Sequence, residues 1–350
     1  MALLDIHDLS IEYRLEEGTL EAVSDVSLAV EAGETVGIVG ESGCGKTTMT
    51  KSILGMLDEN GYVTGGTISY KDDTVSEYSE ERLRKEIRWQ EISYIPQNAM
   101  ASLDPVHTVG AQMKEVIRAH TDQTKNEARE RSAELFERVG LEAARLNDYP
   151  HELSGGQRQR VTIALSLALT PSLIIADEPT TGLDVVVQDE IMSLLDEIQQ
   201  DIGCAILFVT HDMSVIAEVS DRVVVMYAGR TVEVGSITDV FVDSAHPYTI
   251  GLQNAFPKME YSPAFDSLIS IPGSPPDLSD PPVGCRFADR CPWATGECIE
   301  QSPPPVEIDD GHTIECHYPE EADRFRREGA TSDTWQDAQG NAEEMWGSTR

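Results

Sequence analysis

The segment GESGCGKT at residues 40–47 is the strongest single signal in the chain. It fits the pattern G-x-x-x-x-G-K-[ST] of a phosphate-binding loop. The preceding residues 35–39, TVGIV, are apolar and β-branched, which predicts a buried strand. Residues 48–57 then place Met49, Ile53, Leu54 and Leu57 near one face of a helix. A strand, a glycine-rich loop and a helix in this order predict an α/β nucleotide-binding fold, whereas a chance glycine turn before a helix is the bland alternative.

The chemistry of this loop follows from its residue types. Glycines let the backbone approach phosphate oxygens, and successive N–H groups at a helix N-terminus point at the anion. Lys46 adds a positive charge for the β- and γ-phosphates, and the Thr47 hydroxyl can bind Mg²⁺. The expected nucleotide contacts in this segment are Gly40, Glu41, Ser42, Gly43, Cys44, Gly45, Lys46, Thr47 and Thr48.

Composition bounds the class of protein. The chain has 350 residues, so we expect one large domain with an appendage. It contains no apolar run of about 18 residues and no visible signal peptide, which predicts a cytoplasmic protein without a membrane span. The formal net charge is −36, from 62 acidic and 26 basic residues, which disfavours free nucleic acid as a partner. Acidic residues spread along the whole chain suggest a halophilic source, where salt screens self-repulsion.

The first third of the chain surrounds the loop with strands. Residues 1–34 alternate apolar runs with polar turns and predict a small antiparallel β region. Tyr13 lies in it, and its ring either stacks on adenine or is an ordinary strand tyrosine. The strand at residues 92–95 ends near Gln97. Residues 98–155 then become helical, with a capping box at Thr124-x-x-Glu127, which predicts a helical insertion.

The middle of the chain carries a second anion-binding signal. Ser154, Gly155, Gly156 and Gln157 have capping-box spacing, so the glycines should lie in the first turn of a helix and expose N–H groups. This second site is useful if it serves the nucleotide of another subunit.

Acidic and polar residues then follow two predicted buried strands. The strand at residues 173–178 ends in Asp177, placed to hold Mg²⁺ beside a phosphate loop, and Glu178, placed to deprotonate a water. Residues 182–184, ending at Asp184, turn into a helix over 185–200. The strand at 206–210 ends at His211.

Taken together and in this order, these motifs resemble the ATP-binding cassette transporter ATPases over about residues 3–260. The resemblance implies a P-loop NTPase fold with a RecA-like α/β core, an antiparallel β subdomain and a helical subdomain. It implies that ATP binds between the phosphate loop of one subunit and the 153–157 segment of a second, head-to-tail subunit. It assigns Gln97 to Mg²⁺ and water sensing, Asp177 to Mg²⁺, Glu178 to the catalytic base and His211 to the switch histidine. Asp184 and, less directly, Tyr13 join the nucleotide contacts.

Further phrases resemble the dipeptide/oligopeptide importer branch. They are residues 149–160, His246-Pro247-Tyr248-Thr249, and the cysteine-bearing segment from residue 284. The resemblance implies a peripheral ATPase on the cytoplasmic face of the membrane, paired with a second, similar ATPase in a heterodimer. Two permease subunits and an extracytoplasmic solute-binding protein would be the other components of the transporter. The cargo would be peptides or a related solute such as nickel or a sugar.

Four cysteines cluster in the C-terminal part, with spacing C-x5-C-x6-C-x17-C at Cys285, Cys291, Cys298 and Cys316. In a cytoplasmic protein such a cluster suggests metal rather than disulfides, and four thiolates can saturate one centre. The tail is similar to one that carries a [4Fe–4S] cluster, with Zn²⁺ as the alternative. We expect a C-terminal region over residues 261–320, in which residues 272–282 form a linker and the metal centre stabilises the small lobe that follows it. Residues 321–350 are expected to form a disordered tail.

Two other functions compete with transport. One is a soluble cassette ATPase acting on ribosomes or DNA, and the other is a nucleotide-binding regulator without turnover. The sequence shows neither a second cassette nor a long coiled coil, and Glu178 and His211 are intact. Because every nucleotide motif precedes the linker, the sequence also predicts that ATP hydrolysis does not depend on the cysteine-bearing lobe.

Overall fold

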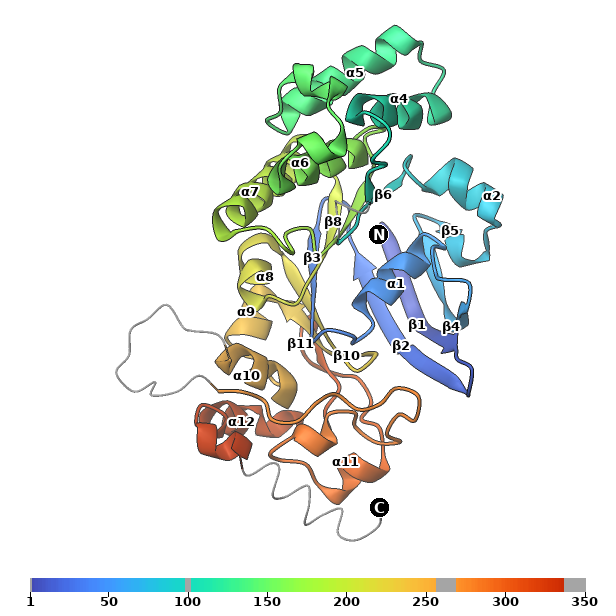
Figure 1. Cartoon of the computed structure of the whole chain (residues 1–350). Coiled ribbons are helices and arrows are strands. Elements are labelled where there is room, and N and C mark those ends of the chain that lie inside the picture. The colour runs from blue at the N-terminus through green and yellow to red at the C-terminus, as the bar shows by residue number, and fades with distance from the viewer. Residues whose placement is uncertain (1, 98–101, 256–268, 337–350) are drawn as a thin grey trace.

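The computed structural model describes residues 2–97, 102–255 and 269–336. An eight-stranded sheet forms its centre, in the order β11-β12-β10-β9-β3-β8-β7-β6 (Figure 1). Strands β9, β3, β8, β7 and β6 are parallel, and β9, β10, β12 and β11 pair antiparallel. The strands are β3 (Thr35–Val39), β6 (Ile92–Ile95), β7 (Leu173–Asp177), β8 (Ala205–Thr210), β9 (Arg222–Tyr227), β10 (Arg230–Ser236), β11 (Val306–Asp309) and β12 (His312–Ile314).

A second, antiparallel sheet lies beside the first in the order β2-β1-β4-β5 (Figure 1). Its strands are β1 (Leu4–Arg14), β2 (Thr19–Val30), β4 (Gly61–Tyr70) and β5 (Asp73–Thr74). The predicted antiparallel region at the N-terminus is therefore confirmed. Its apolar residues pack with one face of the central sheet in a common core.

The parallel strands are buried along their whole length. Every residue of β3, β7 and β8 is buried, which is why these segments read as continuous apolar runs rather than alternating ones. Two apolar clusters cover the opposite faces of the sheet. The side chains of Ile38 and Leu207 belong to one, and those of Val39 and Phe208 to the other. The carboxyl ends of these strands meet at the edge where the functional residues lie.

The helical insertion contains α4 (Val109–His120), α5 (Lys125–Arg138) and the beginning of α6 (Gly155–Ser166). The predicted capping box is confirmed: Thr124 accepts from the backbone N–H of Glu127, and the Glu127 carboxylate accepts from that of Thr124. Gly140 follows α5 with φ +73°, a left-handed conformation that ends the helix. These helices lie at one end of the molecule (Figure 1).

The remaining helices connect and cover the sheets. They are α1 (Lys46–Ile53), α2 (Glu80–Arg82), α7 (Val185–Ile202), α8 (Met213–Val219), α9 (Ile237–Phe241), α10 (Pro247–Asn254), α11 (Gly296–Glu300) and α12 (Ala322–Glu328). A π-helical turn spans Leu83–Ile87, and short 3₁₀ turns span Val75–Glu77, Ala143–Asn147, Pro150–Glu152, Ala288–Arg290 and Pro319–Glu321. Among the described helices, none is both long and apolar enough to cross a membrane.

The C-terminal extension, a name used below for the described residues 269–336, contributes two strands to the central sheet. Strand β12 pairs with β10, and β11 pairs with β12. The segment expected to be a linker lies against β2, where the Leu278 carbonyl accepts from the N–H of Glu21 at 2.9 Å. The expectation of disorder from residue 321 is wrong for its first part, because Phe325 and Trp335 are each 1% exposed and anchor that segment in the core. Residues 337–350 lie outside the described residues.

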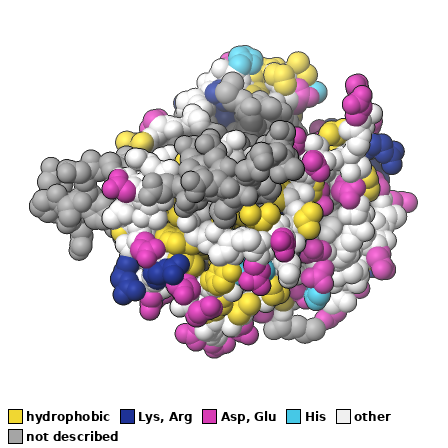
Figure 2. Space-filling view, turned by 90° about the horizontal axis from the view of Figure 1, so that it is seen from below, with side chains coloured by type: hydrophobic (Ala, Val, Ile, Leu, Met, Phe, Trp, Pro, Cys, Tyr) yellow, Lys and Arg dark blue, Asp and Glu magenta, His cyan; other side chains and the backbone are white. Residues whose placement is uncertain are grey.

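The acidic composition appears at the surface. Seen from the side of the extension, magenta carboxylates are scattered across the face, with few Lys or Arg side chains (Figure 2). On this face the described carboxylates are therefore scattered rather than gathered in one place.

Candidate nucleotide-binding and hydrolysis site

The phosphate loop connects β3 to α1 and wraps around its own lysine. Lys46 is 5% exposed, and its ammonium donates to the carbonyls of Gly40 and Glu41 at 2.7 and 2.9 Å. Gly45 has φ +100°, and a Cβ added there would lie 2.4 Å from the Ala22 carbonyl oxygen. The loop therefore requires glycine at this position, and it surrounds a charge placed to meet phosphate oxygens.

The predicted magnesium ligands lie next to each other. The Thr47 hydroxyl donates to one oxygen of Asp177 at 3.1 Å, and the Tyr94 hydroxyl donates to the other at 2.7 Å. Burial raises the pKa of Asp177, opposed by these two hydrogen bonds. A carboxylate and a hydroxyl at the base of a phosphate loop form an oxygen donor set suited to Mg²⁺. The structure thus brings Thr47 and Asp177 together as expected.

Glu178 is the centre of a second network, just after β7. One of its carboxylate oxygens accepts from the Gln97 amide and the Thr181 hydroxyl, each at 2.8 Å. Its other oxygen lies 3.2 Å from Nδ1 of His211. Gln97 follows β6 and His211 follows β8, so the ends of three adjacent parallel strands supply this network. Glu178 has φ +46°, an unusual conformation for a residue other than glycine.

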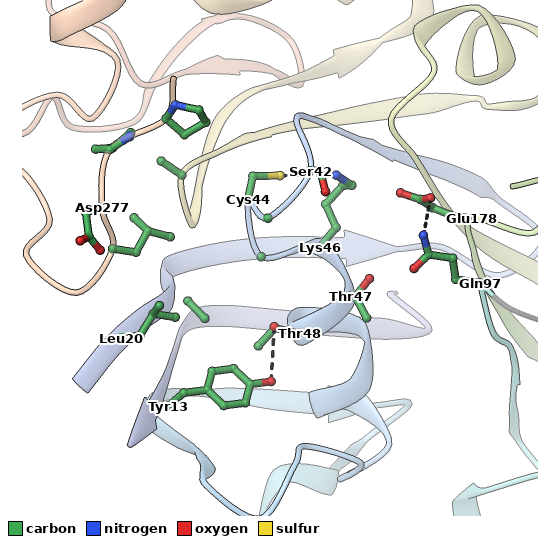
Figure 3. A pocket seen from close by; sticks show the side chains of 17 residues that line it. Tyr13, Leu20, Ser42, Cys44, Lys46, Thr47, Thr48, Gln97, Glu178 and Asp277 are labelled. Carbon is green, nitrogen blue, oxygen red and sulfur yellow. Dashed lines mark hydrogen bonds between the residues drawn. The ribbon is translucent and has the colours of Figure 1, made fainter. Parts of the chain in front are cut away.

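Gln97, Glu178 and residues 42–48 of the phosphate loop line one pocket of about 420 Å³ (Figure 3). Asp177 and His211, which contact Thr47 and Glu178, are not among its lining residues. Gln97 and Glu178 lie at one end, the phosphate loop at the centre, and Tyr13 at the other end, where its hydroxyl is 3.4 Å from that of Thr48. The volume lies within the usual range for small-ligand sites. The pocket is lined by Tyr13, Leu20, Ala22, Ser42, Gly43, Cys44, Gly45, Lys46, Thr47, Thr48, Gln97, Glu178, Ala228, Pro275, Pro276, Asp277 and Leu278.

The second anion-binding segment has the predicted local structure but lies outside this pocket. Ser154 caps α6, and its N–H donates to the Gln157 side chain at 3.0 Å in a capping box. Asp184 caps α7 by accepting from the N–H of Val187 at 3.1 Å. A Cβ on Gly156 would approach a Val187 methyl carbon at 2.7 Å, so the starts of α6 and α7 are in close contact. None of Ser154, Gly155, Gly156, Gln157 and Asp184 lines the pocket of its own chain.

The four C-terminal cysteines line one small cavity together with His246, Pro247, Phe287, Ala288, Trp293, His317, Tyr318 and Phe325. All are free thiols. Burial raises the pKa of Cys285 to about 12 and that of Cys316 to about 11, and neighbouring thiols add to both effects. Within the described residues, however, no three His, Cys, Asp or Glu side chains are grouped so that they could hold a metal ion. The predicted metal-binding lobe is therefore not supported by the described residues.

Two family models match the chain. The model for "ABC transporter" matches residues 23–181, and that for "Oligopeptide/dipeptide transporter, C-terminal region" matches residues 232–298. The chain is 45% identical to a probable peptide ABC transporter ATP-binding protein, y4tR, of Sinorhizobium fredii, over 90% of this chain and 94% of the relative. It is 43% identical to the oligopeptide transport ATP-binding protein OppD of Escherichia coli, over 91% and 94%.

The chain belongs to the ABC transporter ATPases. Solved structures of such cassettes share its fold. A dimeric post-hydrolysis structure of the cassette MJ0796 bound to ADP and Pi matches with TM-score 0.60 and 29% identity, over 67% of this chain and 98% of that chain. The cassette cbiO1 of Clostridium perfringens, part of the cbiONQ complex, matches with TM-score 0.59 and 29% identity, over 69% and 91%. The predicted P-loop NTPase cassette fold is confirmed.

Sequence reasoning missed several residues of this ABC ATPase site. Tyr94 donates a hydrogen bond to Asp177, and Thr181 donates one to Glu178. Both residue types are common in strands and turns, so nothing in the sequence marked them. Residues 275–278 line the pocket although they follow the phosphate loop by more than half the chain. Glu41 was expected to contact nucleotide, but its side chain does not line the pocket and bonds instead to Arg290. The proline-rich composition of residues 272–282 predicted an extended segment, but it did not predict that this segment would lie beside the pocket.

Proposed function

We propose that the chain is the ATP-hydrolysing subunit of an importer that energises uptake of dipeptides or oligopeptides through a membrane permease. A related solute such as nickel or a sugar is the alternative cargo. The observation that carries this proposal is the presence of a complete set of hydrolysis residues and an oligopeptide/dipeptide transporter C-terminal region in one chain.

The geometry supports a division of labour within the site. Lys46 and the loop N–H groups would bind the β- and γ-phosphates, and Tyr13 would meet the adenine. Thr47, Asp177 and Gln97 would hold Mg²⁺, which neutralises phosphate charge when bound. Glu178 lines the same pocket as the phosphate loop and would accept a proton from the water that attacks the γ-phosphate. Gln97 and His211 keep the carboxylate of Glu178 in place.

We further propose a head-to-tail pair of ATPases, in which residues 154–157 of each subunit contact the nucleotide of the other. The 154–157 segment is outside the pocket of its own chain, so a second subunit is needed for it to contact ATP. Val185 and Val186, which begin α7 beside this segment, are 79% and 69% exposed, so two adjacent apolar side chains are available for contact with a second subunit. A paralogous ATPase is the partner we favour, on the basis of the family resemblance.

Transport is tested by reconstitution with a permease pair and a solute-binding protein in vesicles. We expect uptake of a labelled di- or oligopeptide that requires ATP and is lost in Glu178→Gln. Co-purification with the detergent-solubilised permease would place the chain at the cytoplasmic face of the membrane. ATP hydrolysis with neither permease binding nor peptide uptake would favour the soluble, uncoupled ATPase instead.

Coupling to the permease is proposed to run through the segment after Gln97. Residues 98–101 lie outside the described residues, but residues 102–105 lead into the helical insertion. Because Gln97 touches Glu178, nucleotide contacts can move this insertion as a unit. Substitutions within 98–105 should reduce transport while sparing basal ATP hydrolysis. Normal transport by these variants would count against the idea.

We also propose that the four cysteines hold a [4Fe–4S] cluster. Each iron of such a cluster takes one thiolate, so its ligands surround a cavity rather than converging on one ion as Zn²⁺ requires. Cys285, Cys291, Cys298 and Cys316 all line one cavity, and this shared cavity is the observation that supports the proposal. The cluster would tie together the segments that carry these residues. Brown colour and iron in anaerobically purified protein would support it, whereas zinc or no metal would refute it.

Finally, we propose that the chain works in a salt-rich cytoplasm. The net charge of −36 comes from acidic residues spread along the whole sequence, and the self-repulsion of such charges falls as salt is added. Circular dichroism should show loss of structure in dilute buffer and recovery in concentrated salt. An unchanged spectrum in dilute buffer would contradict a halophilic origin.

A further inference from the structure

The C-terminal extension reaches the phosphate loop through one buried arginine. Arg290 is 6% exposed, and its guanidinium donates to both carboxylate oxygens of Glu41, at 2.9 and 3.0 Å. Glu41 is the second residue of the phosphate loop and is 249 positions away in sequence. A bidentate arginine–carboxylate pair fixes orientation as well as distance. The extension therefore contacts the phosphate loop through a side chain that does not line the pocket.

Arg290 is itself held from several directions. Its Nε donates to the Pro272 carbonyl at 2.8 Å, and its Nη1 donates to the Tyr227 hydroxyl at 3.1 Å. Phe287 packs edge-on against Tyr227, with ring centroids 5.2 Å apart. These contacts and the low exposure fix the position of the guanidinium. Because Glu41 is bonded to it, the position of Glu41 depends on that of the extension.

A second contact fixes the backbone of the same loop residue. The N–H of Glu41 donates to the hydroxyl of Tyr248 at 3.0 Å, and Tyr248 is fully buried on α10. The Glu41 carbonyl accepts from Lys46 at 2.9 Å. One residue thus connects the extension on one side with the phosphate-binding lysine on the other. Movement of Glu41 would shift a carbonyl that holds Lys46.

We propose that Arg290 is a positioning residue for ATP binding, which acts on the phosphate loop through Glu41. The proposal rests on ATP being the substrate, as proposed above. The sequence predicted that ATP hydrolysis does not depend on the extension, because every nucleotide motif precedes residues 272–282. Arg290 lies after these residues and contacts the phosphate loop, so hydrolysis can depend on the extension. The extension then supports the ATP site, in addition to forming a folded lobe of its own.

The test uses the full chain and measures KM and kcat for ATP hydrolysis, together with the midpoint of thermal unfolding. Arg290→Gln and Glu41→Gln should each raise KM roughly tenfold, a typical size for coupled contacting groups, while kcat changes by less than about twofold. The double variant should be no worse than either single one. Arg290→Lys should recover part of the affinity, because it keeps the charge and loses only the bidentate geometry.

Arg326→Gln is the matched control. Arg326 also ties the extension to the cassette, by donating to the carbonyls of Asp243 and Ser244 at 2.8 and 2.7 Å, but it does not touch the phosphate loop. It should lower the unfolding midpoint without raising KM. An unchanged KM in Glu41→Gln, or effects of Arg290→Gln and Glu41→Gln that simply add, would overturn the proposal. Absence of ATP hydrolysis in the parent chain would instead refute the proposed function.

Discussion

Replacement of Glu178 by glutamine tests the assignment of the catalytic base most directly. The carboxylate is mostly buried, with 13% of the side chain exposed, and it accepts hydrogen bonds from Gln97 and Thr181 on one oxygen. A glutamine carbonyl oxygen can take both of these. Its amide group would then face Nδ1 of His211, which can accept a hydrogen bond in the appropriate tautomer. Glu178→Gln should therefore fold and bind ATP with the pocket geometry retained.

The loss of the base sets the size of the effect. General-base catalysis contributes typically ~10²–10⁴-fold, which corresponds to roughly 3–5 kcal/mol in activation free energy. We expect kcat to fall by this factor while the dissociation constant for ATP changes little. The variant should also accumulate an ATP-bound dimer, which size-exclusion chromatography with Mg-ATP would detect, because the closed state no longer turns over.

The control is Glu197→Gln, which removes an exposed carboxylate on α7 without touching the pocket. It should hydrolyse ATP at the parent rate. Parent-rate hydrolysis by Glu178→Gln would refute the assignment of the base. Loss of ATP binding in that variant would show that Glu178 organises the pocket rather than accepting the proton.

Three further predictions concern other parts of the molecule. Tyr13→Ala should raise KM for ATP by roughly 5–150-fold if the ring stacks on adenine, since such stacking contributes about 1–3 kcal/mol. Tyr13→Phe should restore most of the affinity in the same kinetic assay. Cys291→Ser should lower the iron content of anaerobically purified protein, measured by elemental analysis and visible absorption; unchanged iron would show that this thiol is not a ligand. Burial of His312 disfavours its charge, but the hydrogen bond and charge of the buried Glu233 outweigh this and raise the pKa of His312. The pair should therefore stabilise the fold fully below the ordinary histidine pKa of about 6.5, and this contribution should be lost as pH rises through the raised pKa. The free energy of unfolding of the parent, measured by denaturant titration, should exceed that of His312→Gln, and the difference should shrink between pH 6 and pH 9. A constant difference across that range would contradict this.

Local sequence patterns were sufficient for most of the cassette. The strand-loop-helix pattern around residues 40–47, the apolar strands ending at Gln97, Asp177 and His211, and both capping boxes are encoded within a few residues of each other. Parallel strands place their carboxyl ends along one edge, so knowing the strands was enough to expect their terminal polar residues to meet there.

The tertiary structure alone decided how the C-terminal extension is used. A proline-rich segment and four spaced cysteines predicted a lobe behind a linker, because composition carries no information about what an extended segment lies against. The contact between Arg290 and Glu41 joins residues 249 positions apart, and neither residue type is unusual in its local context. Nothing near Phe325 or Trp335 marked them as core residues either, since their burial depends on apolar surface supplied by distant parts of the chain. The sequence by itself predicted which side chains carry the proposed chemistry of ATP hydrolysis, because those residues lie in short local motifs. Only the packing of distant segments determined that the extension contacts the phosphate loop, through Arg290 and Glu41.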